Sequence, residues 1–242
     1  MDIMDISIVI PALNESTKIR FDAEAAASFI KDTGLSGEVI IVDDGSTDGT
    51  AETARKADIP ASVKLSVIRL EKNSGKGYAV KTGIEKTGGN VVLFADSGTC
   101  IPYANALEQI ERIRAGELDI AIASRRLKDT RIIRDRRWKR RMLSWLFRQA
   151  AIAITGLPRR ITDSQCGFKL YTGKIARELF SQCQTRDFLF EIEILLRALQ
   201  KDYRVEEFPV EWTCDLDTRL RPGRIAFRVL KELFRVRSIV KK

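Results

Sequence analysis

The first half of the chain alternates short apolar runs with segments of helical periodicity. The runs are uninterrupted and rich in β-branched residues, which predicts strands buried on both faces. These strands are expected at residues 6–10, where Pro11 ends the run, and at 39–42, 63–70, 91–95 and 119–124. The helices between them are expected at 22–32, 50–57, 75–87 and 102–114. This alternation predicts an α/β fold with a mostly parallel central sheet and helices on both faces.

The second half of the chain is less regular. It contains predicted helices at 137–155, 173–183, 188–201 and 222–239, a strand at 204–212 and a polar loop up to residue 221. The stretch 160–170 is expected to be irregular. We find no internal repeat, low-complexity tract or linker, and therefore expect a single domain over residues 1–242, made of the halves 1–124 and 125–242.

The composition is that of an ordinary globular protein. Of the 242 residues, 44% are hydrophobic and 31% are charged, which argues against a disordered or fibrous chain. The chain has no histidine, which excludes Ser-His-Asp and Cys-His catalysis and every histidine-containing zinc site. Its four cysteines form no C-x-x-C pair, so we expect free thiols in a reducing, cytoplasmic compartment.

Positive charge is concentrated in two stretches. The net charge is +9, yet residues 125–148 alone carry eleven basic and two acidic side chains, and residues 219–242 carry nine basic and one acidic. The rest of the chain is therefore net acidic. This asymmetry points to an anionic partner, which could be nucleic acid, a membrane surface or a phosphorylated substrate.

Nothing in the sequence resembles a targeting or membrane-spanning segment. The N-terminus lacks the basic start and the long apolar run of a signal peptide. The longest apolar stretch near the middle, residues 145–157, is interrupted by Arg148 and Gln149 and is too short to cross a bilayer. We expect a protein that is soluble or lies on a membrane without crossing it.

Polar clusters follow three of the predicted strands. Glu15 follows the first strand, Asp43 and Asp44 follow the second, and Asp96 follows the fourth. The carboxyl ends of parallel strands meet at one edge of a sheet, where such folds bind ligands. We therefore expect these carboxylates to converge on one site. For Asp48 we favour a structural role at the start of a helix.

Several motifs resemble family 2 glycosyltransferases, which have the GT-A fold. They are Val9-Ile10-Pro11-Ala12-Leu13-Asn14-Glu15, Val42-Asp43-Asp44-Gly45-Ser46-Thr47-Asp48-Gly49-Thr50, Gly75-Lys76-Gly77 and Thr162-Asp163-Ser164-Gln165-Cys166-Gly167-Phe168-Lys169-Leu170-Tyr171. The last motif is similar to the branch that includes dolichol-phosphate mannose synthase and dolichyl-phosphate glucosyltransferase. The resemblance covers roughly residues 5–212 and implies that residues 1–124 bind a nucleotide sugar.

The resemblance assigns roles to residues of the first half. Pro11, Ala12 and Glu15 would border the nucleoside, with Glu15 accepting hydrogen bonds from ribose hydroxyls. Asp44 would accept a hydrogen bond from the base, and either uracil or guanine offers a ring N–H donor. Lys76, at the start of a helix, would hold phosphate.

The family's Asp-x-Asp metal motif is incomplete in this chain. Asp96 occupies its first position, but Ser97-Gly98 follows, so the second carboxylate is missing. One Mg²⁺ or Mn²⁺ ion bridging a diphosphate needs only one or two protein carboxylates, because phosphate oxygens and water complete its shell. We expect one ion at Asp96, with Gln165 as a further oxygen ligand.

The second-half motif supplies the remaining candidates. Asp163 is expected to act beside the metal or as a base, and Gln165 to contact sugar or metal. Glu191 is a weaker candidate acid on the helix that follows. Arg125, directly after the fifth strand, is expected to bind phosphate or stabilise the leaving charge.

The choice of acceptor depends on whether a base is needed. A sugar hydroxyl must lose a proton when it attacks, whereas a lipid phosphate is already anionic and needs cations to hold it. Candidate cations lie close to the motifs: Arg125, Arg126, Arg131, Arg134, Arg219, Arg221 and Arg224. Their abundance favours a phosphate acceptor.

Two predicted helices combine basic and apolar sides. In the helix at 137–155, Trp138, Met142, Trp145 and Ile152 share one side, beside arginines. This pattern is typical of helices that bind an anionic membrane surface. The same pattern fits a core helix with a solvated charged face equally well. For the apolar side of the last helix, packing against another helix, a homo-oligomer and a membrane-protein partner are all open.

The sequence thus predicts an inverting transferase that moves a hexose from UDP- or GDP-hexose to a polyprenyl phosphate, peripheral at the inner face of the membrane. An alternative within the family is transfer to a glycan or other hydroxyl, with Asp163 or Glu191 as base. Another is a degenerate transferase that binds without turnover. A non-enzyme alternative is a basic nucleic-acid-binding protein, against which no nucleic-acid module is recognisable; we expect no nucleic-acid partner.

Overall fold

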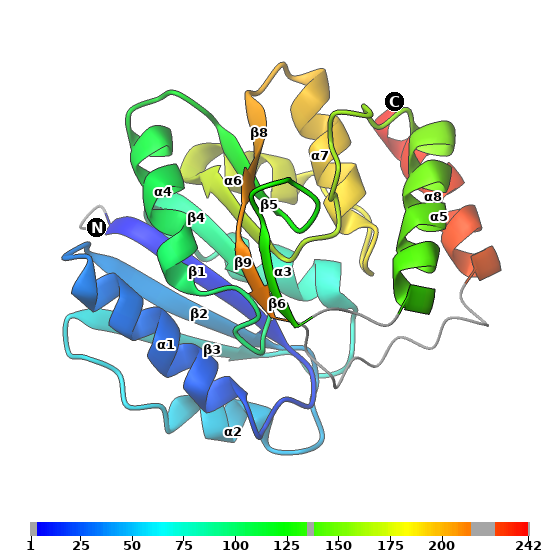
Figure 1. Cartoon of the computed structure of the whole chain (residues 1–242). Coiled ribbons are helices and arrows are strands. Elements are labelled where there is room, and N and C mark those ends of the chain that lie inside the picture. The colour runs from blue at the N-terminus through cyan, green and yellow to red at the C-terminus, as the bar shows by residue number, and fades with distance from the viewer. Residues whose placement is uncertain (1–3, 135–137, 214–225, 242) are drawn as a thin grey trace.

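A computed structural model describes residues 4–134, 138–213 and 226–241. Figure 1 shows a central sheet with helices on both of its faces. The helices are α1 (Ile19–Asp32), α2 (Thr50–Arg55), α3 (Lys76–Ile84), α4 (Leu107–Arg114), α5 (Trp138–Thr155), α6 (Gly173–Ser181), α7 (Phe190–Gln200) and α8 (Ala226–Val240), with the 3-10 helix η1 at Tyr103–Ala106.

The central sheet has seven strands in the order β3-β2-β1-β4-β7-β5-β8. Their bounds are β1 Met4–Ala12, β2 Gly37–Asp43, β3 Val63–Arg69, β4 Gly89–Ala95, β5 Ile120–Ser124, β7 Phe168–Thr172 and β8 Val205–Pro209. β7 alone runs antiparallel to its neighbours β4 and β5 among these pairings, which confirms the mostly parallel α/β fold. β6 (Arg131–Arg134) and β9 (Glu211–Thr213) form a separate two-stranded sheet.

Alternate side chains of the central strands enter two different cores. In β1, Ile8 and Ile10 pack on the side of α1, α2 and α4, whereas Val9 packs on the side of α3 and α6. All three side chains are fully buried. This double burial is why the strands read as uninterrupted apolar runs.

Four predicted elements differ from the structure. Pro11 does not end the first strand, because β1 continues to Ala12 beside β2. The pairing of β1 with β4 stops at Val9, so no hydrogen bond to β4 requires the N–H that Pro11 lacks. The predicted strand 204–212 is divided into β8 and β9 after Pro209. The predicted helix 102–114 begins as η1. The stretch 160–170 is not irregular throughout, because β7 starts at Phe168.

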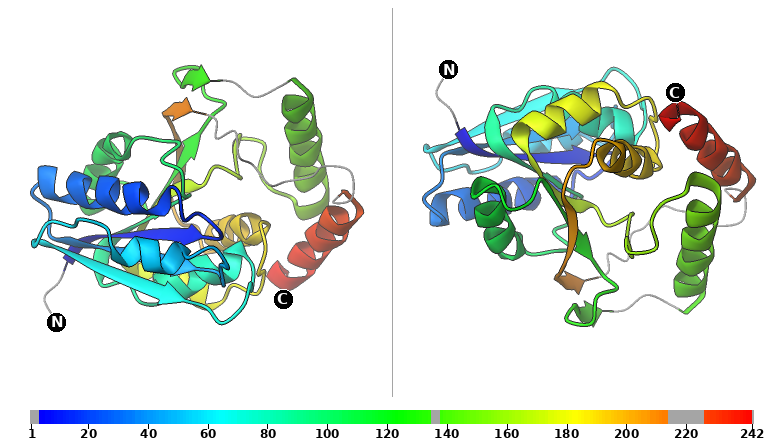
Figure 2. Two further views of the ribbon diagram at one scale, coloured as in Figure 1. Left: turned by 90° about the horizontal axis from the view of Figure 1, so that it is seen from below. Right: turned by 90° about the horizontal axis from the view of Figure 1, so that it is seen from above.

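Helices α5 and α8 lie side by side at one end of the molecule, in both views of Figure 2. α8 packs against α5 and α7, and its Leu233 and Val236 are buried in the core, so helix packing covers this part of its apolar side. The C-terminal half of α5 also packs into the core, through Ala151. Further towards its N-terminus, the described side chains of Met142, Leu143, Trp145 and Leu146 are exposed.

Side chains on this end remain exposed. They are Met142, Leu143, Trp145 and Leu146 of α5 and Leu230 and Phe234 of α8. Trp145 is 52% exposed and Phe234 is 57% exposed. In the part of the chain that the structure describes, no helix has both the length and the apolar character needed to span a bilayer.

Candidate active site

The turns after β1 and β2 are joined by hydrogen bonds. The N–H of Asn14 donates to Oγ of Ser46 at 2.7 Å, and the N–H of Glu15 donates to Oγ1 of Thr50 at 2.8 Å. Asp48 holds the same junction: its carboxylate accepts from the N–H groups of Ser16 and Thr50, which confirms its structural role. Pro11 and Ala12 are buried just before the turn. The turns that carry the first two acidic clusters therefore lie against each other.

Asp44 ties the start of α3 to this edge. Its two carboxylate oxygens accept from the N–H groups of Ser74 at 2.7 Å and of Gly75 at 3.0 Å. Burial raises the pKa of Asp44 above its ordinary value, while the two N–H donors act in the opposite direction. Asp44 thus shapes the loop in front of Lys76; its contact with a base stays a prediction.

The predicted Gly-Lys-Gly helix start is confirmed, and its glycines have a packing role. Gly75 has a φ of +100°, and a Cβ on it would lie 2.5 Å from the carbonyl oxygen of Arg186. A Cβ on Gly77 would meet the carbonyl of Thr185 at 2.7 Å. The close approach of this segment fixes where Lys76 stands. The ammonium of Lys76 lies 2.8 Å from Oδ1 of Asp96.

Asp96 begins the loop after β4 and is positioned from two sides. Its N–H donates to the carbonyl of Gly167 at 2.7 Å, and a Cβ on Gly167 would overlap the Asp96 carboxylate. The following residues are held by buried Asp22 of α1, which accepts from the Gly98 N–H at 2.9 Å and from the Thr99 hydroxyl at 2.6 Å. The Asp96 side chain is nonetheless 42% exposed, so it can reach a ligand.

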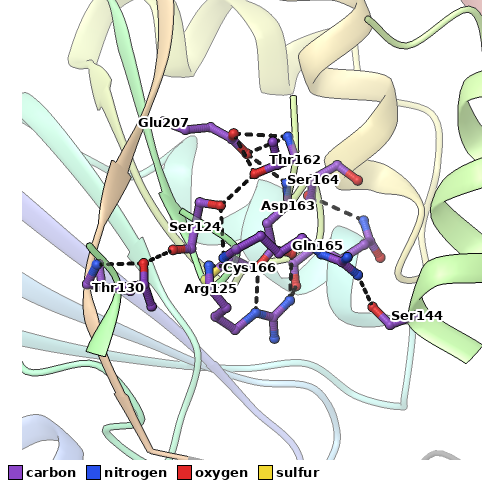
Figure 3. A network of polar contacts seen from close by, with 12 residues as sticks. Ser124, Arg125, Thr130, Ser144, Thr162, Asp163, Ser164, Gln165, Cys166 and Glu207 are labelled. Atoms are coloured by element: carbon purple, nitrogen blue, oxygen red, sulfur yellow. Dashed lines mark hydrogen bonds and ion pairs between the residues drawn. The ribbon is translucent and has the colours of Figure 1, made fainter. Parts of the chain in front are cut away.

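The loop 162–167 is held in place by buried and half-buried charged residues (Figure 3). Glu207 of β8 accepts from the N–H groups of Thr162 and Asp163 at 2.7–2.9 Å. Asp163 in turn forms a two-point ion pair with Arg125, with Nε to Oδ2 at 2.7 Å and Nη2 to Oδ1 at 2.8 Å. Burial would raise the pKa of Asp163, but the Arg125 guanidinium outweighs it and holds this pKa below its ordinary value.

Two cations, one half-buried and one fully buried, also fix three successive carbonyl groups of this loop. Arg125 donates to the carbonyl of Gln165 at 3.0 Å, and Lys169 of β7 donates to those of Ser164 at 3.1 Å and Cys166 at 2.8 Å. Lys169 is fully buried and ion-paired with Glu191 of α7. Burial lowers the pKa of Lys169 to about 7. The loop that carries Gln165 and Gly167 therefore has a fixed backbone.

Each of the three acids named as metal or base candidates is paired with a cation. Asp96 faces Lys76, Asp163 faces Arg125, and Glu191 faces Lys169. The sequence predicted a base at Asp163 or Glu191 and a phosphate ligand at Arg125. It did not predict that these residues would form ion pairs. Gln165 is half-buried, and its amide donates a long 3.5 Å hydrogen bond to the Ser164 carbonyl, so the side chain can turn to a ligand.

The oxygen donors at this edge can hold a hard divalent cation only if a bound ligand supplies further oxygens. Among the described residues, no three acids, cysteines or histidines gather as a metal cluster. Asp96 offers carboxylate oxygen and Gln165 offers amide oxygen, and both are types that Mg²⁺ and Mn²⁺ accept. A diphosphate would have to supply further oxygens. The residues fit an ion that arrives with a nucleotide.

The other predicted cations are placed differently. Arg126 donates to the Ser144 hydroxyl of α5 at 2.7 Å, and exposed Arg131 lies 3.7 Å from Glu211. The Arg134 side chain and Arg219, Arg221 and Arg224 lie outside the described residues, as do the Trp138 side chain and Cys214. The other three cysteines are free thiols, as expected.

The sequence reasoning missed Lys169, Glu207 and Asp22. Each is a charged residue at a buried or half-buried position of a strand or helix. The sequence did hold a signal for Lys169, which stands between apolar residues in Gly-Phe-Lys-Leu-Tyr. A lysine in such a run is expected to be buried, and a buried lysine needs a partner because burying its charge alone is too costly.

Comparison with known proteins agrees with the motifs. Residues 7–180 match the model of the family described as Glycosyl transferase family 2. The chain is 32% identical to a dolichyl-phosphate beta-glucosyltransferase of Dictyostelium discoideum over 247 residues, which cover 98% of this chain and 75% of that protein. It is 33% identical to the Saccharomyces cerevisiae protein of the same name over 224 residues, 86% of this chain and 66% of that one.

Solved structures share the fold. Glucosyl-3-phosphoglycerate synthase from Mycobacterium tuberculosis, in complex with UDP, superposes with a TM-score of 0.69 at 20% identity, covering 98% of this chain and 80% of that one. The same enzyme with Mn²⁺, UDP-glucose and phosphoglyceric acid also gives 0.69. At this identity the likeness concerns the GT-A fold alone.

Proposed function

The chain belongs to glycosyl transferase family 2, and on that premise we propose that it transfers glucose from UDP-glucose to the phosphate of a polyprenyl-phosphate lipid. It is a glycosyltransferase with the GT-A fold. The names of its relatives, dolichyl-phosphate beta-glucosyltransferases, support the sugar and the acceptor class. Membership of the family also favours an enzyme over the nucleic-acid-binding alternative.

The observation that supports a phosphate acceptor is that both candidate bases are held in ion pairs. A hydroxyl acceptor needs a carboxylate that can take a proton, yet Asp163 and Glu191 are buried and each is ion-paired. Arg125 holds the pKa of Asp163 below its ordinary value, which makes Asp163 a weak base, and the Glu191 carboxylate is occupied by Lys169. A phosphate acceptor is anionic at neutral pH and needs no base, so this site suits phosphate better than a glycan.

The proposed reaction uses the residues of the carboxyl edge. Pro11, Ala12 and Glu15 border the nucleoside, Asp44 holds the loop and faces the base, and Lys76 binds diphosphate. Asp96, with Gln165, would hold one Mg²⁺ or Mn²⁺, which when bound neutralises the diphosphate. An oxygen of the lipid phosphate attacks the anomeric carbon, the bond from that carbon to the diphosphate oxygen breaks, and UDP leaves. Inversion converts an α-linked donor into a β-linked lipid phosphosugar.

A transfer assay tests this proposal. The full chain is incubated with Mn²⁺, radiolabelled UDP-glucose or GDP-mannose, and a polyprenyl phosphate, a polyprenol or a soluble glycan. We expect labelled lipid only with UDP-glucose and polyprenyl phosphate. We expect an Asp96→Asn variant to be about 100-fold slower, because the ion that would neutralise the leaving diphosphate loses its carboxylate ligand. Transfer to the glycan alone would contradict the proposed acceptor.

We also propose that the exposed end formed by α5 and α8 lies on the cytoplasmic membrane surface. A lipid acceptor must be reached at a bilayer, and four large apolar side chains of α5 are exposed where the helix leaves the core. Basic residues of the stretch 125–148 would add attraction to anionic lipid. Figures 1 and 2 place both helices away from α1 and α2.

Replacing Trp145 and Leu146 by serine should weaken binding to vesicles of anionic phospholipid by at least about tenfold, since each buried side chain of this size contributes about 1.5–3 kcal/mol. Co-sedimentation with the vesicles measures the partition coefficient. The control is Phe21→Ser on α1, because Phe21 is 67% exposed on the other side of the sheet. Equal losses in both variants would count against this surface.

A further inference from the structure

Four alternating charges lead from the site into the core. Asp96 directly follows β4, Lys76 begins α3, Glu191 lies in the first turn of α7, and Lys169 lies in β7. The Lys76 ammonium is 2.8 Å from Oδ1 of Asp96 and 3.6 Å from Oε1 of Glu191. The other oxygen of Glu191 accepts from Lys169. Each oxygen of Glu191 therefore faces a different lysine.

The inner pair is fixed and the outer pair is accessible. Glu191 is 3% exposed and Lys169 is fully buried and also bound to two loop carbonyls, whereas Lys76 is 19% exposed and Asp96 is 42% exposed. Lys76 also lies over the ring of Phe94, 5.2 Å from its centroid, where a cation is favoured. Lys76 thus has two supports besides Asp96.

We propose that Lys76 competes with the divalent metal ion for Asp96, and that Glu191 is the carboxylate that keeps Lys76 paired when the ion takes Asp96. This inference rests on the proposed function, which brings a divalent ion to Asp96. A metal ion that arrives alone must displace an ammonium from its carboxylate. A nucleoside diphosphate supplies oxygens for both the ion and Lys76, so metal and nucleotide assist each other's binding.

The experiment measures Mn²⁺ binding without turnover. Free Mn²⁺ is quantified by its electron paramagnetic resonance signal in titrations of the full chain, with and without UDP. The variant is Lys76→Met, whose apolar chain suits the place beside Phe94 and Phe190. The control is Lys72→Met, which removes the same charge from an exposed position four residues earlier. Lys76→Gln serves as a second variant should Lys76→Met not fold.

We expect nucleotide-free Mn²⁺ to bind Lys76→Met at least about tenfold more tightly than the natural chain, because a positive charge beside the ion is gone. The enhancement of Mn²⁺ binding by UDP should shrink correspondingly. Lys72→Met should stay within about twofold, since an exposed charge is screened. An unchanged Mn²⁺ affinity in Lys76→Met, or an equal gain in Lys72→Met, overturns the inference. Because the experiment measures Mn²⁺ binding and not sugar transfer, its result can be interpreted even if the proposed acceptor is wrong.

Discussion

Asp163→Asn should lower the free energy of unfolding by about 3–5 kcal/mol, because it leaves the Arg125 guanidinium buried without its carboxylate. Both side chains are largely buried, at 15% and 5% exposure, and three hydrogen bonds from Arg125 end on Asp163. Urea denaturation at neutral pH measures the loss. The control Glu52→Gln breaks an exposed pair with Arg69, so it should cost less than about 1 kcal/mol.

The pH dependence of this difference has a defined sign. The Asp163 pKa is lower in the folded chain than its ordinary value of 3.8, so the carboxylate stabilises the fold fully above that pH. The stabilisation is lost as the pH falls through the folded pKa. The natural chain and Asp163→Asn should therefore converge in stability in strong acid, and a gap that persists there would contradict the ion pair as its cause.

A paired replacement separates stability from activity. In Arg125→Met/Asp163→Leu both charges are removed together, so most of the stability should return, as it does when a buried pair is replaced by apolar residues. Sugar transfer should not return, because the Gln165 carbonyl loses its hydrogen bond from Arg125 and the loop is free to move. Recovery of full transfer by this variant would show that the pair serves folding alone.

The placement of the site could be predicted because it follows from strand direction. Apolar runs mark β1, β2 and β4, parallel strands end at one edge, and so Glu15, Asp44 and Asp96 had to follow neighbouring strand ends. The sequence motifs then named the residues of each turn. The α3 start at Lys76 was equally local, since Gly75 and Gly77 mark it.

The partners of these residues could not be predicted in the same way. That Asp163 pairs with Arg125, and Glu191 with Lys169, depends on β7 entering the sheet antiparallel between β4 and β5. β7 is short, and its lysine breaks the apolar run, so the pattern suggested an irregular stretch. Long-range pairing of buried charges has no periodicity in sequence, and this is why residues proposed as a base and a phosphate ligand turned out to hold each other.

The register of β7 also places Gly167 against Asp96, so that a substitution of Gly167 should have a large effect on sugar transfer. Phe168 pairs with Ala95, which brings the next residues, Gly167 and Asp96, face to face. A Cβ on Gly167 would overlap the Asp96 carboxylate, so Gly167→Ala must displace either the loop or the acid. The loop resists displacement because its carbonyls are bound by Arg125 and Lys169. Asp96 is the more exposed of the two sides and should move.

Gly167→Ala should therefore reduce sugar transfer by about 100-fold, the cost of displacing a group at the reacting centre by about an ångström. The fold should lose only about 1–3 kcal/mol, as for other overpacked positions. Steady-state transfer and thermal unfolding measured on the same sample separate the two effects. Gly88→Ala is the control, because a Cβ there meets only Oε1 of Glu38 at 3.6 Å, an ordinary contact. Normal transfer by Gly167→Ala would mean that Asp96 is not held where the sugar is transferred, which removes the geometric basis for its role.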